Sequence, residues 1–268
     1  MGLELTILLV LIALVGGICV TTIGPGGIFV TIALYQLLAL GPGAVAGTAS
    51  AAYMATALAG SLAYLKSGEL RNGPALRTAA VLSISSIAGA WFGAILNTRL
   101  DAGTFGAFLG GFVVLVGVVI LLRERKLARH LAAGGTAAED PDLDTWGSRF
   151  AMVAVGLGVG IPGGMLGVGG PVLAVPAMIM LGVPMLLSVA LAQVQSIFIS
   201  VFATMGYAAQ GVVDWSLALL VGVPLLIGTV IGWWIALRMD AGRLKTGLAV
   251  VLVVVGLYLL LAGPPAVA

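Results

Sequence analysis

The chain has 268 residues, of which 61% are apolar and only 8% carry a charged side chain. Soluble domains carry about 25% charged residues, so this composition excludes an ordinary soluble protein and predicts a multi-pass membrane protein embedded in the lipid bilayer. A bilayer core about 30 Å thick needs about 20 helical residues, so the length allows roughly eight to ten helical segments and no separate extramembrane domain. The 12 basic and 10 acidic residues nearly balance, and the basic ones lie in short connections, so nucleic acid is not an expected partner.

The first half of the chain begins with an apolar segment that lacks the basic flank and cleavage site of a signal peptide. We expect this segment to be retained as a membrane segment. The apolar segments of this half lie at residues 3–22, 28–40, 44–65, 74–96 and 104–122.

One substantial hydrophilic stretch, residues 123–148, divides the chain. It opens with basic residues and turns acidic from Glu139. We interpret it as a cytoplasmic linker between a first membrane unit, residues 1–122, and a second, residues 149–268. The apolar segments of the second unit lie at residues 150–161, 171–181, 186–209, 216–237 and 244–261.

The two halves match each other at several positions in the same order. The matches are residues 98–103 with 237–242, Gly89 and Gly93 with Gly228 and Gly232, Gly26-Gly27 with Gly169-Gly170, and Tyr64 and Gly68 with Tyr207 and Gly211. Such ordered matches predict an internal duplication. The small residues at a spacing of four are typical of helices whose backbones approach closely in a membrane.

Basic residues are distributed differently over the connections of the two halves. The connection around Lys66, Arg71 and Arg77 is basic, whereas its equivalent in the second half holds Asp214 and no base. Cytoplasmic loops collect Lys and Arg, so the second half is predicted to lie upside down relative to the first. Inverted repeats are typical of secondary transporters. An inversion requires an odd number of crossings in each repeat, and here it places both termini outside the cytoplasm.

The lengths of the segments predict a hairpin at the start of each half. Segments 150–161 and 171–181 are each about a dozen residues, or about 18 Å of helix, which does not span a bilayer. The equivalent pair, 3–22 and 28–40, has a first arm long enough to cross, so five spans stay open as an alternative to a hairpin and three spans. We favour the hairpin. The predicted fold class is therefore an all-α integral membrane protein of two inverted repeats, each a short helical hairpin plus about three transmembrane helices.

Glycine-rich turns at residues 21–27 and 160–171 connect the arms of the two hairpins. Non-helical backbone at membrane depth is tolerated only where protein buries it or where it lines a wet cavity, so these turns are candidate substrate sites. The helices that follow are predicted to begin near Ile28 and Pro171. Their free amide groups and positive dipole ends can hold an anion without a charged side chain. Tight helix packing is the alternative explanation of the glycines.

The second turn contains the pattern Gly-x-Gly-Gly-Pro-Val-Leu-x-Val-Pro from Gly167 to Pro176, followed by Leu-Gly-Val-Pro at residues 181–184. This pattern and its degenerate copy at residues 24–48 resemble the sulfite exporter TauE/SafE family of bacterial membrane permeases. The resemblance covers essentially the whole chain, including the duplication and the linker. It implies a protein of the bacterial inner membrane that transports sulfur-containing anions such as sulfite, sulfoacetate or related sulfonates.

Neutral polar side chains on the helix after each hairpin complete the predicted site. When the two halves are aligned so that Gly26 corresponds to Gly169, Ser50 corresponds to Gln193 and Tyr53 to Ser196. Both halves would therefore direct neutral donors toward one central volume. Gln193 and Gln195 are the costliest to bury and hence the strongest side-chain candidates, with interhelical hydrogen bonding as the alternative. The predicted substrate-binding residues are Thr22, Gly24, Gly26, Gly27, Thr48, Ser50, Tyr53, Gly167, Gly169, Gly170, Gln193, Gln195 and Ser196.

The apolar segments hold no Asp, Glu, Lys, Arg or His away from their ends. Proton-coupled carriers commonly use an intramembrane carboxylate or histidine, which is absent here. A potential negative inside drives a monovalent anion outward by about 2.3 kcal/mol per 100 mV. These observations predict a secondary transporter that exports a small anion by alternating access.

Other functions stay open at this point. An anion channel or an importer of the same anion coupled to a cation would fit the same segments, and a membrane scaffold is the least specific alternative. No nucleophile has a base beside it and no His, Cys or carboxylate cluster has metal-ligand spacing, so neither an enzyme nor a cofactor is expected. The sequence predicts no oligomeric state.

Overall fold

The computed structural model describes residues 2–38, 40–70, 73–132, 145–238 and 242–262. Over these residues the chain is all-helical, with ten α-helices and one short 3-10 helix, η1. The first half contains α1 (Leu3–Thr22), η1 (Pro25–Gly27), α2 (Ile28–Leu37), α3 (Pro42–Ser67), α4 (Gly73–Asn97) and α5 (Ala102–Ala132). The second half contains α6 (Trp146–Leu166), α7 (Pro171–Met180), α8 (Met185–Ala208), α9 (Trp215–Ala236) and α10 (Gly242–Ala262).

Among the described residues, six helices are long and apolar enough to cross a membrane: α1, α4, α5, α6, α8 and α9. Their outer faces are apolar as well, since Leu11, Ile84 and Leu219 are each more than half exposed. Large aliphatic side chains exposed in this number over a whole bundle suit contact with lipid and not with water. The predicted class, an all-α integral membrane protein, is confirmed.

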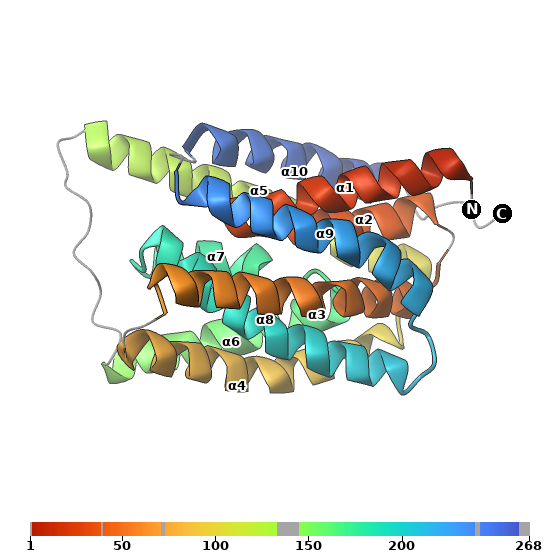
Figure 1. Ribbon diagram of the computed structural model, residues 1–268, viewed down its shortest axis with the longest axis horizontal. Coiled ribbons are helices and arrows are strands. Elements are labelled where there is room, and N and C mark those ends of the chain that lie inside the picture. Colours follow the sequence, from red (N-terminus) through yellow and green to blue (C-terminus); the bar gives the residue numbers. More distant parts are fainter. Residues whose placement is uncertain (1, 39, 71–72, 133–144, 239–241, 263–268) are drawn as a thin grey trace.

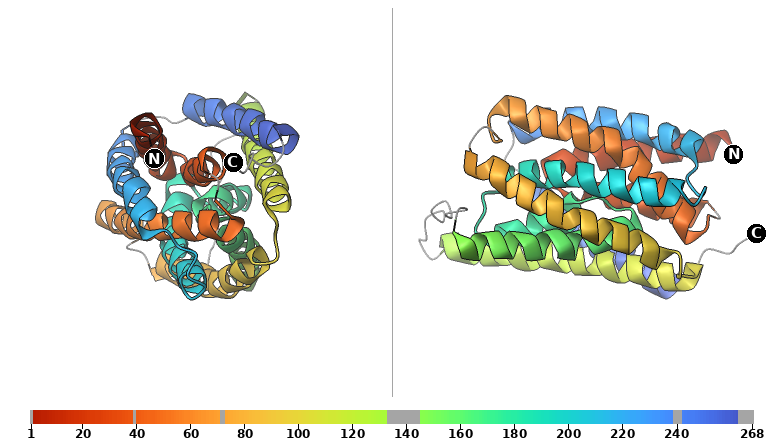
Figure 2. Two further views of the ribbon diagram at one scale, coloured as in Figure 1. Left: turned by 90° about the vertical axis from the view of Figure 1, so that its right-hand side faces the viewer. Right: turned by 90° about the horizontal axis from the view of Figure 1, so that it is seen from below.

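The directions of the helices differ between the two halves (Figures 1 and 2). In the first half, α1 begins at one end of the bundle, α2 turns back toward that end and α3 starts there. In the second half, α6 begins at the opposite end, α7 turns back toward it and α8 starts there. We call the end where α1 begins the terminus end, and the end where α5 finishes and α6 begins the linker end. These directions agree with the predicted inversion, while the orientation of each half in a membrane stays a prediction.

The first arm of the second hairpin is longer than predicted. Helix α6 has 21 residues instead of the expected 150–161, and it passes through Pro162 before it ends at Leu166. The expected turn residue Gly164 is helical. Because it has no side chain, α6 can lie directly on α4 at this point, where a Cβ would come within 2.2 Å of the Ala90 carbonyl oxygen. The prediction that this arm is too short to span was therefore wrong. Only the second arms, α2 and α7, are short, with 10 residues each.

The predicted linker is partly helical. Helix α5 continues beyond residue 122 to Ala132, and α6 begins at Trp146. Residues 133–144, which make up most of the remainder, lie outside the described residues. The division of the chain into a unit at 1–122 and another at 149–268 stays a prediction.

The packing pairs helices across the two halves. Helix α1 packs on α9 and α6 on α4, while α3 packs on α8 and α5 on α10, the last pair lying side by side at one edge of the bundle in Figure 2. At Gly93 of α4 a Cβ would lie 2.1 Å from the Ile161 carbonyl oxygen, and at Gly232 of α9 it would lie 2.3 Å from the Ile18 carbonyl oxygen. This confirms that these small residues allow close contact between helix backbones. Ile18 and Ile161 occupy corresponding places in the two hairpins, so the same contact occurs twice, as a duplication predicts.

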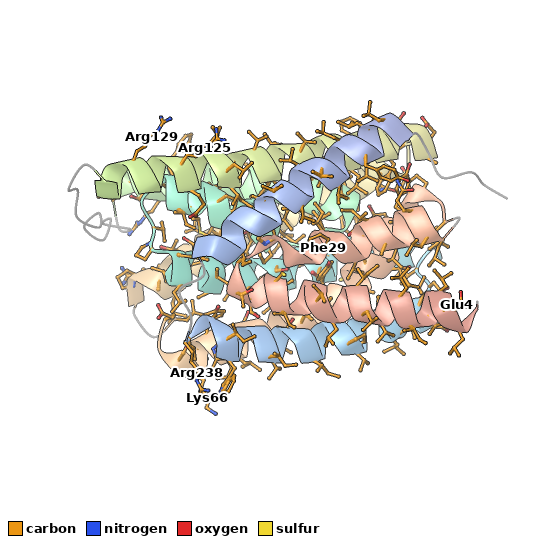
Figure 3. All side chains as sticks on the ribbon, turned by 90° about the horizontal axis from the view of Figure 1, so that it is seen from above. Glu4, Phe29, Lys66, Arg125, Arg129 and Arg238 are labelled. Carbon is orange, nitrogen blue, oxygen red and sulfur yellow. The ribbon has the colours of Figure 1, made fainter. Side chains whose placement is uncertain are left out.

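Charged side chains are distributed unequally between the two ends of the bundle (Figure 3). The labelled basic residues Lys66, Arg125, Arg129 and Arg238 lie toward the linker end, and the acidic Glu4 lies at the terminus end. Because cytoplasmic loops are enriched in Lys and Arg, this distribution favours a cytoplasmic linker end.

Candidate functional site

The two hairpin turns meet inside the bundle. Helix α1 ends where the amides of Ile23 and Gly24 both donate to the Cys19 carbonyl, at 3.0 Å each. Gly24 has a φ of 110°, in the region that only glycine adopts readily, and a Cβ on it would lie 3.0 Å from the Val175 side chain of α7. The turn of the first hairpin therefore lies against the short arm of the second.

A small cavity lies where these turns meet α3 and α8. Its volume is about 10 Å³, close to the smallest that holds one water molecule. All of its lining residues are buried, so it lies in the interior of the bundle. They are Val20, Gly24, Gly27, Tyr53, Thr56, Ala57, Val168, Gly169, Pro171, Gln193 and Ser196.

The polar groups of the cavity are neutral, and no charged side chain lines it. The Tyr53 hydroxyl donates to the Gly27 carbonyl oxygen. At the corresponding place in the second half, the Gly170 amide donates to Ser196 Oγ at 3.3 Å. Gln193 Nε2 donates to the Val20 carbonyl oxygen at 3.4 Å. Each carboxamide nitrogen has two hydrogens, so Gln193 keeps one that can be offered to a ligand.

Two glycines provide the space that these side chains occupy. A Cβ at Gly60 of α3 would lie 2.7 Å from Gln193 Oε1, and a Cβ at Gly27 would lie 2.7 Å from the Tyr53 hydroxyl oxygen. Any larger residue would displace the polar atom that faces it. The position of Gln193 therefore depends on Gly60, which the sequence alone did not single out.

Several of the predicted residues come together at this cavity: Gly24, Gly27, Tyr53, Gly169, Gln193 and Ser196 all line it. Gly170 lies beside it through the bond to Ser196. Ser50 is buried in α3 but is not among the lining residues. Thr56 also lines the cavity. It belongs to the neutral polar side chains of the same helix that the sequence indicates, although it was not among the predicted binding residues. The sequence missed Val20, whose contribution through its backbone leaves no signal in the sequence.

The remaining predicted residues have structural partners elsewhere. Thr22 Oγ1 donates to the Ile18 carbonyl of its own helix at 2.8 Å, as hydroxyls in membrane helices often do. Thr48 Oγ1 accepts from the Asp214 amide at 3.1 Å, at the start of α9. Gln195 Nε2 donates to Ser86 Oγ of α4 at 2.7 Å and so points away from the cavity lining.

Two of the predicted glycines also serve the packing. A Cβ on Gly26 would lie 2.2 Å from the Gly16 carbonyl oxygen of α1. Gly167 ends α6 with a φ of 65°, and its carbonyl oxygen accepts from Thr31 Oγ1 of α2 at 2.8 Å. The latter bond ties the short arm of the first hairpin to the turn of the second.

Comparison with known proteins identifies the family of the chain. The family described as Sulfite exporter TauE/SafE matches residues 9–259. The chain belongs to this family. The resemblance seen in the sequence is thus confirmed, and the chain is a multi-pass membrane protein of a transporter family.

Curated relatives of this TauE/SafE chain match over nearly its whole length. "Probable membrane transporter protein YunE" of Bacillus subtilis (strain 168) is 25% identical over 96% of this chain and 98% of its own. "Probable membrane transporter protein YdhB" of the same organism is 26% identical over 94% and 99%. A "Probable membrane transporter protein" of Xylella fastidiosa (strain 9a5c) is 25% identical over 88% and 87%. No solved structure matches the chain.

Proposed function

We propose that the protein exports a small sulfur-containing anion, such as sulfite, sulfoacetate or another organosulfonate, across the bacterial inner membrane by alternating access. The observation that carries this proposal is the small, buried and uncharged cavity between the two hairpin turns. The description of the family supplies the class of anion.

Neutral groups suit the binding and release of an anion in this setting. The cavity offers the Gln193 carboxamide and the Ser196 hydroxyl, and Pro171 places the first turn of α7 on its wall. The amides of a first helical turn have no partners within the helix, and the positive end of the helix dipole favours negative charge. A full positive charge would hold the anion more tightly and slow its release.

The size of the cavity favours a carrier over a channel. A space of about 10 Å³ does not admit a sulfur oxyanion, so the substrate enters only when the surrounding elements separate. A carrier passes through a state that is closed to both sides, and we assign this conformation to such a state. A channel has a continuous path when it conducts.

Flux from proteoliposomes tests the proposal. Vesicles are loaded with sulfite, sulfoacetate, methanesulfonate, thiosulfate, sulfate or the zwitterion taurine, and a potassium gradient with valinomycin sets the potential. We expect saturable efflux of at least one sulfur anion. For a monovalent anion, the equilibrium ratio of the outside to the inside concentration should rise about fiftyfold per 100 mV, the equivalent of about 2.3 kcal/mol. Taurine, which has no net charge, serves as the control whose movement should not depend on the potential.

Three results of the flux assay would contradict the proposal. Protein-containing vesicles that release every anion no faster than empty ones would exclude the proposed substrates. Efflux that never saturates would indicate a channel. Movement that follows a cation gradient and ignores the potential would indicate coupled import.

A further inference from the structure

Helix α8 carries a line of polar residues from the cavity to the terminus end. Residues 193, 200, 204 and 207 lie within about one quarter of the helix circumference, because they are spaced by seven, four and three residues. This face meets α3 at both ends: a Cβ at Gly60 would contact Gln193, and a Cβ at Gly47 would lie 2.7 Å from Tyr207. Ser200 and Thr204 lie between these contacts on the same face. We call Gln193, Ser200, Thr204 and Tyr207 the α8 polar face.

Ser200 and Thr204 are the unusual members of this face. They are 1% and 3% exposed, and neither hydroxyl has a hydrogen-bond partner. Hydroxyls in membrane helices commonly bond a carbonyl of their own helix, as Thr229 does to Leu225 at 2.9 Å. Two buried hydroxyls that forgo this bond are costly in the closed conformation, which points to a partner that binds only at another stage.

Tyr207 lies at the terminus end of the α8 polar face. Its hydroxyl donates to the Gly164 carbonyl oxygen at 2.9 Å, near the end of α6. Tyr64 of α3 makes the matching bond toward the linker end, to the Thr21 carbonyl oxygen of α1 at 2.7 Å. Both rings are fully buried. The cavity thus lies between two tyrosines that each join a hairpin to the helix after it.

The two directions out of the cavity differ in polarity. At the positions of α3 that match Ser200 and Thr204 stand Ala57, which has no hydroxyl, and Ser61, whose hydroxyl donates to the Ala57 carbonyl at 2.7 Å. Free hydroxyls therefore occur on the α8 side, which leads to the terminus end, and not at the matching places on the side that leads to the linker end.

We propose that Ser200 and Thr204 form a second, transient anion site on the release path, and that Tyr207 is the gate between this site and the terminus end. The inference rests on the proposed function and adds the path by which the anion is released. When Tyr207 separates from α6, the anion moves from Gln193 to the two hydroxyls and then to the solution at the terminus end. Tyr64 is the corresponding gate toward the linker end.

Sided cysteine labelling tests this path. Thr204→Cys and, as the matched position, Ser61→Cys are placed in a Cys19→Ser background, since Cys19 is the only cysteine of the chain. A membrane-impermeant thiol reagent should label Thr204→Cys from the terminus side and Ser61→Cys from the linker side. Adding Tyr207→Phe should speed the labelling of Thr204→Cys about fivefold, which equals about 1 kcal/mol, the usual net value of one hydrogen bond. Tyr64→Phe should not speed it.

An anion that the protein transports should slow the labelling of Thr204→Cys and leave that of Ser61→Cys nearly unchanged. Ser200→Cys serves as a second reporter and should behave like Thr204→Cys. Equal effects of Tyr207→Phe and Tyr64→Phe, or labelling of both α8 reporters only from the linker side, would overturn the path. If Tyr207→Phe speeds the labelling of both Thr204→Cys and Ser200→Cys but no sulfur anion moves in the flux assay, the proposed substrate is wrong and the path stands.

Discussion

Replacing Gln193 by leucine is expected to lower the flux of the sulfur anion by about tenfold to a hundredfold, while the protein stays folded. A hydrogen bond to a charged group is worth about 1.5–3 kcal/mol, which corresponds to this range. Gln193 is 1% exposed and lines the cavity, and its bond to the Val20 carbonyl is long at 3.4 Å. Leucine of similar size keeps the packing but offers no donor. Initial efflux rates from proteoliposomes give the measurement.

Gln195→Leu is the matched comparison on the same helix. The Gln195 side chain bonds Ser86 of α4, and its Oε1 has no partner, so leucine removes one hydrogen bond and one costly buried oxygen together. We expect this variant to retain most of the flux. Equal losses in Gln193→Leu and Gln195→Leu would show that general packing of α8, and not a donor at the cavity, limits transport.

Replacing Gly93 or Gly232 by alanine is expected to destabilise the fold itself. A Cβ at these positions would lie 2.1 Å and 2.3 Å from backbone carbonyl oxygens of the partner helices, so α4 must separate from α6, or α9 from α1. Overpacking of a tight interface typically costs about 1–3 kcal/mol. Both variants should lower the thermal unfolding midpoint, Tm, in detergent and reduce the fraction that elutes as a single species.

Gly158→Ala of α6 is the control for these variants, because a Cβ there meets no atom within 4 Å. Alanine also favours a helix over glycine by about 1 kcal/mol, so this variant should be at least as stable as the natural protein. If Gly93→Ala and Gly232→Ala unfold at the same temperature as Gly158→Ala, the helix pairs are not held by close backbone contact.

Hydropathy was sufficient to predict most of the helices of this chain. The apolar segment 186–209 agrees with α8, and the predicted starts at Ile28 and Pro171 agree with α2 and α7. The reason is that a membrane segment must bond its backbone internally, which leaves few alternatives to a helix over an apolar run of sufficient length.

The residues of the site were harder to predict from the sequence, because local sequence patterns do not indicate which helices pack against each other. Glycines around Pro162 indicated a turn, yet contact with α4 keeps them helical, and α6 reaches Leu166. Both glutamines have the same cost of burial in the sequence. Only tertiary contacts distinguish Gln193, which lines the cavity, from Gln195, which bonds Ser86 of α4. Gly60 is recognisable only once Gln193 is seen to occupy the space beside it.

The opposite orientation of the two halves is tested most directly by labelling Ser67→Cys and Gln210→Cys in a Cys19→Ser background. Both residues are exposed, and they occupy corresponding places in the two halves: Ser67 is the last residue of α3, and Gln210 follows the end of α8 by two residues. In intact cells, an impermeant thiol reagent should label Gln210→Cys at once and Ser67→Cys only after the inner membrane is permeabilised. Labelling of both cysteines from the same side would contradict the inverted arrangement, and with it a site shared between two opposed hairpins.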